Sequence, residues 1–152
     1  MLNCRSVLPK LIAGFLLLLI FCRITEVCSQ PNQVKLITHS SVNTASLDKD
    51  QVRRIFTMYQ TNWSDSQPIV VYVLASNNTT HQFFSREILG LFPYQLDRIW
   101  NKLIYSGLGE APTKVYSEQE MLEKIEQQPG SIGYVMSVAV PDDVNIVQLT
   151  EE

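Results

Sequence analysis

The sequence predicts an α/β domain with a mostly parallel sheet and helices on both of its faces. Short apolar segments rich in β-branched residues alternate with longer amphipathic segments along the chain. Two of the apolar segments, residues 69–74 (IVVYVL) and 132–135 (IGYV), are nearly free of polar side chains, as strands covered on both faces are. Strands that alternate with helices favour a parallel sheet between two helical layers. No internal repeat, low-complexity tract or interdomain linker interrupts this alternation.

The first 29 residues have the composition of a signal peptide. Arg5 and Lys10 supply a positively charged region before an apolar run at residues 11–21 (LIAGFLLLLIF). That run is shorter than the roughly 20 residues that a transmembrane helix needs. Small or tolerated residues before Gln30 predict cleavage at that point, which would export the protein to the periplasm or out of the cell. An uncleaved membrane anchor is the alternative interpretation.

Cleavage before Gln30 would leave one domain of ordinary size at residues 30–152. All the cysteines of the chain lie within residues 1–29, namely Cys4, Cys22 and Cys28. A mature chain without thiols has no disulfides, thiolate metal sites or cysteine nucleophiles. It would carry nine basic and fourteen acidic residues, a formal charge of −5. This acidity argues against a nucleic-acid partner, because binding phosphates along a backbone needs a basic surface.

The first half of the expected domain begins with a strand at residues 34–37 and continues with a helix after Asp48. Asp48 and Gln51 have the spacing of a capping box, in which each side chain accepts the other residue's backbone N–H. The next strand is expected at residues 69–74. The helix after Asp48 has an apolar stripe made of Val52, Ile55 and Phe56.

Two further helices are expected in the middle of the chain. A polar loop at residues 75–78 leads into the first, at residues 79–89, which Gly90 ends. Pro93 begins the second, because its fixed φ and missing N–H suit the first helical position. The residues expected to face inward are Phe83, Phe84 and Ile88 on the first helix and Leu96, Ile99, Trp100 and Leu103 on the second.

The last part of the chain predicts a helix, a sharp stop and two strands. Ser117 and Glu120 form a second candidate capping box at the start of the helix. Pro129-Gly130 ends the helical segment, with Gly130 suited to a left-handed conformation. Strands are expected at residues 132–135 and 145–149. On the helix, Met121, Leu122 and Ile125 are expected to face inward, and Glu118, Glu123, Lys124 and Gln127 outward.

Four blocks carry a resemblance to a known family: residues 48–56 (DKDQVRRIF), 61–65 (TNWSD), 103–112 (LIYSGLGEAP) and 118–135 (EQEMLEKIEQQPGSIGYV). In this order and spacing they resemble the phosphate ABC transporter substrate-binding proteins. In particular they are similar to short members that consist of a signal peptide and little more than one lobe. The resemblance covers residues 34–149 and implies one lobe of a type 2 periplasmic binding protein.

The resemblance also implies a ligand site. In the family, a motif like R-x-D-G-S-G-T-T follows a strand and opens a helix, where free amides and hydroxyl groups bind an anion. The matching stretch here makes the candidate ligand-binding residues Ser76, Asn77, Asn78, Thr79 and Thr80. The implied ligand is phosphate or a similar oxyanion. One lobe would supply half of a cleft, so tight binding would need a second copy or another protein.

The same stretch departs from the family motif. Ala75 stands at the position of the family's aspartate, and asparagines stand at positions of serine and glycine. No arginine occurs in residues 69–75, which removes a charge-assisted contact to the anion. His81, interpreted as an exposed residue, is a candidate for a positive charge near this helix start at mildly acid pH.

Other residues predict structure rather than chemistry. Trp63 and Trp100 are interpreted as core or lid residues, with contact to a partner as the alternative. No G-x-S-x-G, H-E-x-x-H or glycine-rich phosphate cradle occurs, so no catalytic residue, metal ligand or cofactor is predicted. The acidic residues on the helix after Ser117 are interpreted as a solvated face: Glu118, Glu120, Glu123 and Glu126.

Two functions remain open from the sequence. The first is an exported, non-catalytic solute-binding domain that acts in transport, with phosphate or a similar oxyanion as the first-candidate ligand. The second is an accessory module of the cell envelope that has lost ligand binding. Such a module would contact itself, a transporter, a sensor or an envelope protein. The departures from the motif favour the second function, and the order of the four blocks favours the first.

Overall fold

The structure is a computed structural model that describes residues 33–150. These residues lie within one compact unit, Asn32–Glu152. The predicted signal peptide at residues 1–29, with its three cysteines, lies outside the described residues. Among residues 33–150, no helix has both the length and the apolar character needed to cross a lipid bilayer.

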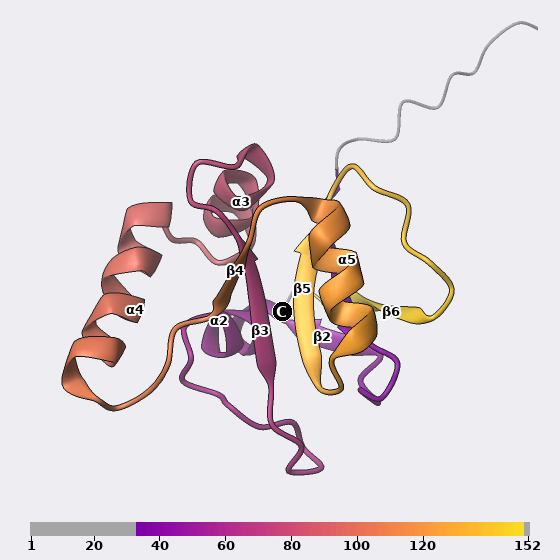
Figure 1. The fold of residues 1–152 in the computed structure, drawn as a ribbon, viewed down its shortest axis with the longest axis horizontal. Helices are drawn as coiled ribbons and strands as arrows, with labels where there is room; N and C mark the ends of the chain where they lie inside the picture. The colour runs from indigo at the N-terminus through magenta and orange to yellow at the C-terminus, as the bar shows by residue number, and fades with distance from the viewer. Residues whose placement is uncertain (1–32, 151–152) are drawn as a thin grey trace, which may run out of the picture. The chain divides into compact units, whose positions relative to one another are not determined.

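A six-stranded sheet with the order β2-β6-β1-β5-β3-β4 forms the centre of the fold (Figure 1). The pairs β2–β6, β3–β4 and β3–β5 are parallel, whereas β1 runs antiparallel to both β5 and β6. All strands except β1 therefore point in one direction, and the predicted mostly parallel sheet is confirmed. The strands are β1 (Lys35–His39), β2 (Ser46–Asp48), β3 (Val70–Leu74), β4 (Thr113–Val115), β5 (Ser131–Val135) and β6 (Val144–Thr150).

Helices cover both faces of the sheet, as the sequence predicts. Successive side chains of a strand point to opposite faces, and β5 shows what each face contacts. A side chain at Gly133 would meet Met121 of α5, whereas the ring of the next residue, Tyr134, contacts Phe56 of α2 and Phe84 of η1. The helical elements are α2 (Lys49–Phe56), α3 (Thr79–Phe83), the π-helical turn η1 (Phe84–Ile88), α4 (Pro93–Ser106) and α5 (Glu118–Gln127).

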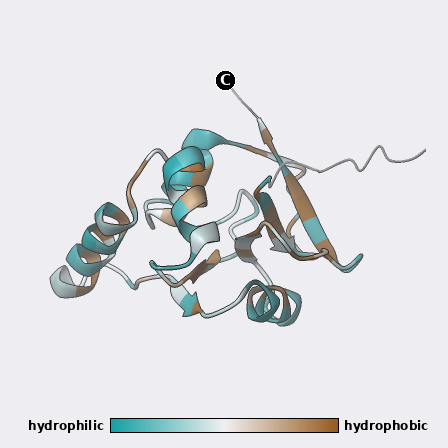
Figure 2. Ribbon diagram, turned by 90° about the horizontal axis from the view of Figure 1, so that it is seen from above, coloured by the Kyte–Doolittle hydropathy of each residue, from teal (hydrophilic) through white to brown (hydrophobic). Residues whose placement is uncertain are grey.

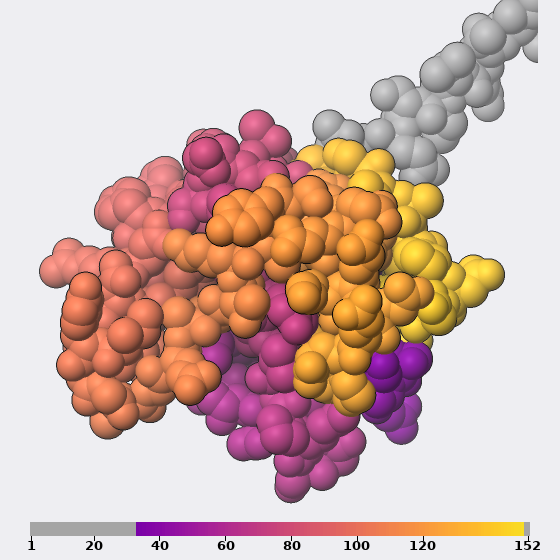
Figure 3. Space-filling view, in the orientation of Figure 1, coloured from indigo at the N-terminus to yellow at the C-terminus, as the bar shows by residue number. Residues whose placement is uncertain are grey.

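The hydrophobic core lies between these layers. Every residue of β5 is buried, and the ring of Tyr134 stacks on Phe84 with 3.9 Å between centroids. Trp100 of α4 donates its indole N–H to the carbonyl of Phe56 at 2.9 Å, which attaches α4 to the last residue of α2. Figure 2 shows the hydrophobic colouring concentrated on the strands, and Figure 3 shows α5 covering much of the near face.

Both tryptophans are core residues, which is the first of the two predicted interpretations. Trp63 and Trp100 are each buried. The indole N–H of Trp63 donates to the carbonyl of Gly130 at 2.9 Å and so fixes the turn before β5. Gly130 has a φ of 78°, which confirms the predicted left-handed conformation.

The predicted capping boxes have different outcomes. At α2, Asp48 accepts from the amide of Gln51 at 2.7 Å, and Gln51 accepts from the amide of Asp48 at 3.3 Å, so this box is confirmed. At α5, Ser117 accepts from the amide of Glu120 at 3.1 Å as predicted. The carboxylate of Glu120 instead accepts from the amide of Tyr116 at 2.8 Å. In the second predicted capping box, the bond to Ser117 is therefore confirmed, but the carboxylate of Glu120 accepts the amide of Tyr116 rather than that of Ser117.

The structure corrects two details of the predicted elements. The strands β2 and β4 are absent from the prediction, because three-residue strands at the edges of a sheet are too short to show an alternating pattern. The helix predicted at residues 79–89 changes at Phe84 into a π-helical turn, with Leu89 N–H bonded to the carbonyl of Phe84 at 3.2 Å. Phe83, predicted to face inward, is 39% exposed, and His81 takes a buried position instead.

Candidate functional site

The carboxyl ends of three neighbouring strands meet at one edge of the sheet. Short connecting segments follow them at residues 75–78 after β3, 116–117 after β4 and 136–138 after β5. The chain passes from β3 to α3 on one face and from β4 to α5 on the other, so the two connections diverge at this edge. Open α/β sheets bind their ligands in such a crevice. The candidate site is therefore built from these three connections.

The start of α3 is closed by the chain's own side chains. Asn78 is the N-cap residue, and its side-chain oxygen accepts the N–H of Thr80 at 2.8 Å. Thr79 is exposed at the first helical position. The side chain of Thr80 is buried and turns away from solvent toward α5. The predicted residues at the helix start therefore point in different directions.

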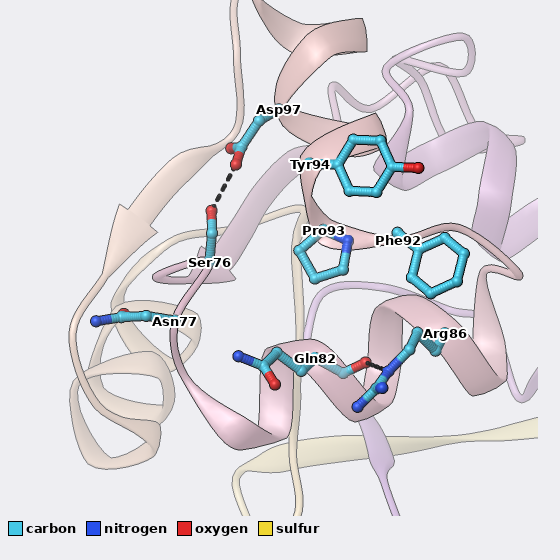
Figure 4. A pocket seen from close by; sticks show the side chains of 8 residues that line it. All are labelled: Ser76, Asn77, Gln82, Arg86, Phe92, Pro93, Tyr94 and Asp97. Atoms are coloured by element: carbon cyan, nitrogen blue, oxygen red, sulfur yellow. Dashed lines mark hydrogen bonds between the residues drawn. The ribbon is translucent and has the colours of Figure 1, made fainter.

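Ser76 and Asn77 line an open cavity of about 510 Å³ between the α3–η1 segment and the first turn of α4 (Figure 4). Arg86 of η1 lines this cavity, and its Nε donates to the carbonyl of Gln82 at 3.1 Å (Figure 4). Among residues 33–150, the two terminal nitrogens of Arg86 have no partner. The cavity is lined by Ser76, Asn77, Gln82, Arg86, Phe92, Pro93, Tyr94 and Asp97.

Charge in the cavity is divided between one paired carboxylate and one arginine. Asp97 accepts from the hydroxyl of Ser76 at 2.8 Å and from the ammonium of Lys114 at 3.4 Å. The cavity lining contains one arginine, Arg86, which comes from a helical turn after the loop rather than from the strand before it. On the remaining side, the rings of Phe92 and Tyr94 stack at 5.8 Å and are both exposed.

Glu118 occupies the crevice itself, which corrects its prediction as a solvated outward residue. One carboxylate oxygen accepts from the hydroxyl of Thr80 at 2.5 Å. The other accepts from three consecutive backbone amides, those of Met136 at 3.2 Å, Ser137 at 2.8 Å and Val138 at 3.2 Å. Burial works to raise the pKa of this carboxyl, but the hydrogen bonds outweigh burial and hold the pKa below its ordinary value.

His81 is buried, with 1% of its surface exposed, which corrects its interpretation as an exposed residue. Its Nδ1 lies 2.5 Å from the hydroxyl oxygen of Tyr134, and its Nε2 has no partner among residues 33–150. Burial lowers the pKa of His81; Asp97 opposes this shift and Lys114 adds to it. The imidazole is therefore neutral at physiological pH and adds no charge to an anion site. Its spacing to Phe84 and Ile88 on one helical stripe was the available signal for burial.

The sheet order and the helices on both faces make this part of the chain an α/β lobe with a mostly parallel sheet. Among solved structures, the chain is similar to a phosphate ABC transporter substrate-binding protein with bound phosphate from Clostridium perfringens, with a TM-score of 0.62 and 23% identity over 76% of this chain and 44% of that one. It is also similar to an ABC-type phosphate transport receptor from Vibrio cholerae, with a TM-score of 0.60 and 16% identity over 83% and 53% of the two chains. A third similar structure is that of PstS from Borrelia burgdorferi, with a TM-score of 0.58 and 15% identity over 76% of this chain and 46% of that one.

The likeness to these structures confirms the predicted fold. The chain spans about half the length of the structures it matches. No protein-family model matches the sequence, and no curated protein matches it either. At these identities the fold is the shared property, so the ligand has to be argued from the residues of this chain.

Proposed function

We propose that this chain is an exported, non-catalytic binding domain for a small solute that carries an oxyanion group, with phosphate as the first candidate. The observation that carries the proposal is that the polar Ser76–Asn77 loop and the guanidinium of Arg86 line one cavity. Arginine offers planar, paired donors that match phosphate and carboxylate oxygens. The lining also contains two amide side chains, those of Asn77 and Gln82, which can supply neutral hydrogen-bond donors.

The size and lining of the cavity set the class of solute. At about 510 Å³ it has the volume of a small-molecule site and exceeds the needs of an inorganic anion alone. Phe92 and Tyr94 add an apolar surface opposite the charged group. A phosphate ester or a carboxylate with a flat apolar body therefore fits the same donors as free phosphate.

The fold supports the solute-binding class, since its solved relatives are described as phosphate transport proteins. Of the loop residues predicted from the sequence, Ser76 and Asn77 line the cavity and remain in this proposal, with Asn78 and Thr79 next to them in the chain. The hydroxyl of Thr80 bonds to Glu118 and is not part of this proposal. Transport, and the membrane complex that would accept the solute, follow from the resemblance and are proposed with it.

The experiment is a thermal titration of the mature domain with phosphate, a phosphate monoester and an aromatic carboxylate, each against sodium chloride at matched ionic strength. A ligand at about one hundred times its dissociation constant should raise the melting temperature by several degrees. Arg86→Gln should abolish the rise. Arg98→Gln, an exposed arginine of α4 outside the cavity lining, is the matched control and should retain it. A rise of equal size in Arg86→Gln would place the anion elsewhere.

A second candidate function is an interaction module, and a specific observation favours it. The last turn of α4 and the loop after it expose three large apolar side chains close together in the sequence: Ile104, Tyr105 and Leu108. A partner or a second copy would cover them. Light scattering of the mature domain, with and without Tyr105→Ser, measures whether two copies associate through this surface. The absence of a specific response to anions at millimolar concentration would favour the interaction module over solute binding.

A further inference from the structure

The carboxylate of Glu118 lies in the kind of crevice in which open α/β sheets bind ligands. It lies at the carboxyl ends of β3, β4 and β5, in the crevice where the connections of β3 and β4 diverge. Its four donors come from two places far apart in the sequence, Thr80 on α3 and the segment 136–138 after β5. Glu118 therefore connects the two faces of the sheet through hydrogen bonds to one anion.

The four donors that residues 33–150 supply to this carboxylate are all neutral. Three successive amides converge on one oxygen, with Ser137 nearest at 2.8 Å, and make a concave backbone nest of the kind that binds anions. The hydroxyl of Thr80 serves the other oxygen at 2.5 Å. No lysine or arginine within residues 33–150 forms an ion pair with Glu118. Hydrogen bonds from neutral donors to a charged acceptor are the strong ones, and these four together hold the carboxylate.

We propose that Thr80 and the amides of residues 136–138 form an oxyanion-binding site whose resident occupant is the carboxylate of Glu118. Free oxyanions of the carboxylate or phosphate class fit the same donors but must displace this tethered group. A tethered group competes at an effective concentration on the order of millimolar or above, so the native chain leaves the site closed to dissolved anions. This site shares no residue with the lining of the Arg86 cavity and stands independently of the function proposed for that cavity.

Removing the tethered carboxylate should open the site to a dissolved one. Glu118→Ala leaves three amides and a hydroxyl without an acceptor, which should lower the melting temperature. Formate, acetate and phosphate should then each restore several degrees in a saturable manner, relative to chloride at equal ionic strength. Glu118→Gln should show no such gain, because its side-chain carbonyl still fills the nest.

Matched variants separate this site from general salt effects and from the cavity. Glu123→Ala removes an exposed carboxylate from the same helix and should show no oxyanion-specific gain. The gain in Glu118→Ala should persist when Arg86→Gln is added and should shrink when Thr80→Val is added. Calorimetric titration of Glu118→Ala with formate gives the affinity directly, and the wild type should bind formate at least tenfold more weakly.

Each outcome decides the proposal. A folded Glu118→Ala that responds to oxyanions no more than Glu123→Ala does would overturn it, and would leave Glu118 as a structural tie alone. If Glu118→Ala folds only when formate or acetate is present, the expectation is met. The proposal would also be overturned if Glu118→Ala remained unfolded in formate, in acetate and in phosphate alike. A negative result at this site leaves the Arg86 test unaffected, since the Arg86→Gln comparison is made in the chain with Glu118 in place.

Discussion

The hydroxyl oxygen of Tyr134 lies 2.5 Å from Nδ1 of His81, so that β5 is bonded to α3 through two buried side chains. The same oxygen accepts the backbone N–H of Leu74 at the end of β3, at 3.1 Å. One hydroxyl therefore serves three elements that meet beneath the candidate site. Burial raises the pKa of Tyr134, which keeps the group a neutral hydroxyl throughout the range in which the protein is handled.

Tyr134→Phe should destabilise the domain by about 1–3 kcal/mol, because it leaves the buried N–H of Leu74 and Nδ1 of His81 without a partner. Urea unfolding followed by circular dichroism measures the change. Tyr72→Phe is the matched control: it removes the same atom from a largely buried tyrosine whose hydroxyl bonds to no residue within 33–150, and it should cost much less. Equal costs would show that the hydroxyl of Tyr134 contributes nothing beyond its packing.

The buried histidine predicts a dependence of stability on mildly acid pH. Burial holds the pKa of His81 in the folded protein below its ordinary value of 6.5, with Asp97 opposing and Lys114 adding to the shift. As pH falls below 6.5, the unfolded chain takes up a proton at this residue before the folded chain does, so the free energy of unfolding falls. Unfolding of the wild type at pH 7.5 and pH 5.5 should show this loss, and His81→Phe should show a smaller one. An identical difference in both proteins would contradict the assignment.

The sequence predicted correctly those features that depend only on residues close together in the chain. The Asp48–Gln51 box, the Pro93 start of α4 and the turn at Gly130 each depend on residues within a few positions, and the structure confirms all three. The central strands were predictable because burial on both faces leaves an apolar run. The edge strands were not, since β2 and β4 form through pairing with distant strands rather than through a pattern of their own.

The residues of the candidate site were harder to predict, because their partners are far away in the sequence. Glu118 looks like any acidic residue in the first turn of a helix until β5 and α3 bring amides and a hydroxyl to it. Arg86 reaches the cavity by its place on η1, one turn beyond Gln82, rather than by the strand position that the family motif specifies. Only the spacing of His81 with Phe84 offered a local signal of burial.

A second pH dependence should appear in a more acid range. Hydrogen bonds from Thr80 and from residues 136–138 outweigh burial and hold the pKa of Glu118 below its ordinary value of 4.5. The stability that Glu118 provides is therefore fully present above pH 4.5 and is lost as pH falls below it toward the folded-state pKa. The melting temperature of Glu118→Gln should fall less than that of the wild type between pH 5 and pH 3. A parallel fall in the two proteins would show that other carboxyl groups account for the whole effect.

A comparison of three glycines separates two reasons for glycine at position 130: the left-handed backbone conformation and the lack of space for a side chain. Gly130 has a φ of 78°, and a Cβ there would meet the carbonyl oxygen of Pro68, a backbone atom that cannot move aside cheaply. Gly107 has a similar φ of 67° but open space around it. Gly109 has neither the left-handed conformation nor a neighbour within 4 Å.

Replacing each glycine with alanine should therefore give a graded series. Gly109→Ala should be close to neutral, whereas Gly107→Ala should cost about 1 kcal/mol for the left-handed conformation alone. Gly130→Ala should lower the free energy of unfolding more than Gly107→Ala, because the added methyl group would push against the carbonyl oxygen of Pro68. That clash would also strain the two hydrogen bonds that the carbonyl of Gly130 accepts from Trp63 and Val70. Thermal unfolding of the three variants side by side measures the series. Equal costs at Gly107 and Gly130 would mean that the contact with Pro68 relaxes freely and that only the backbone conformation matters.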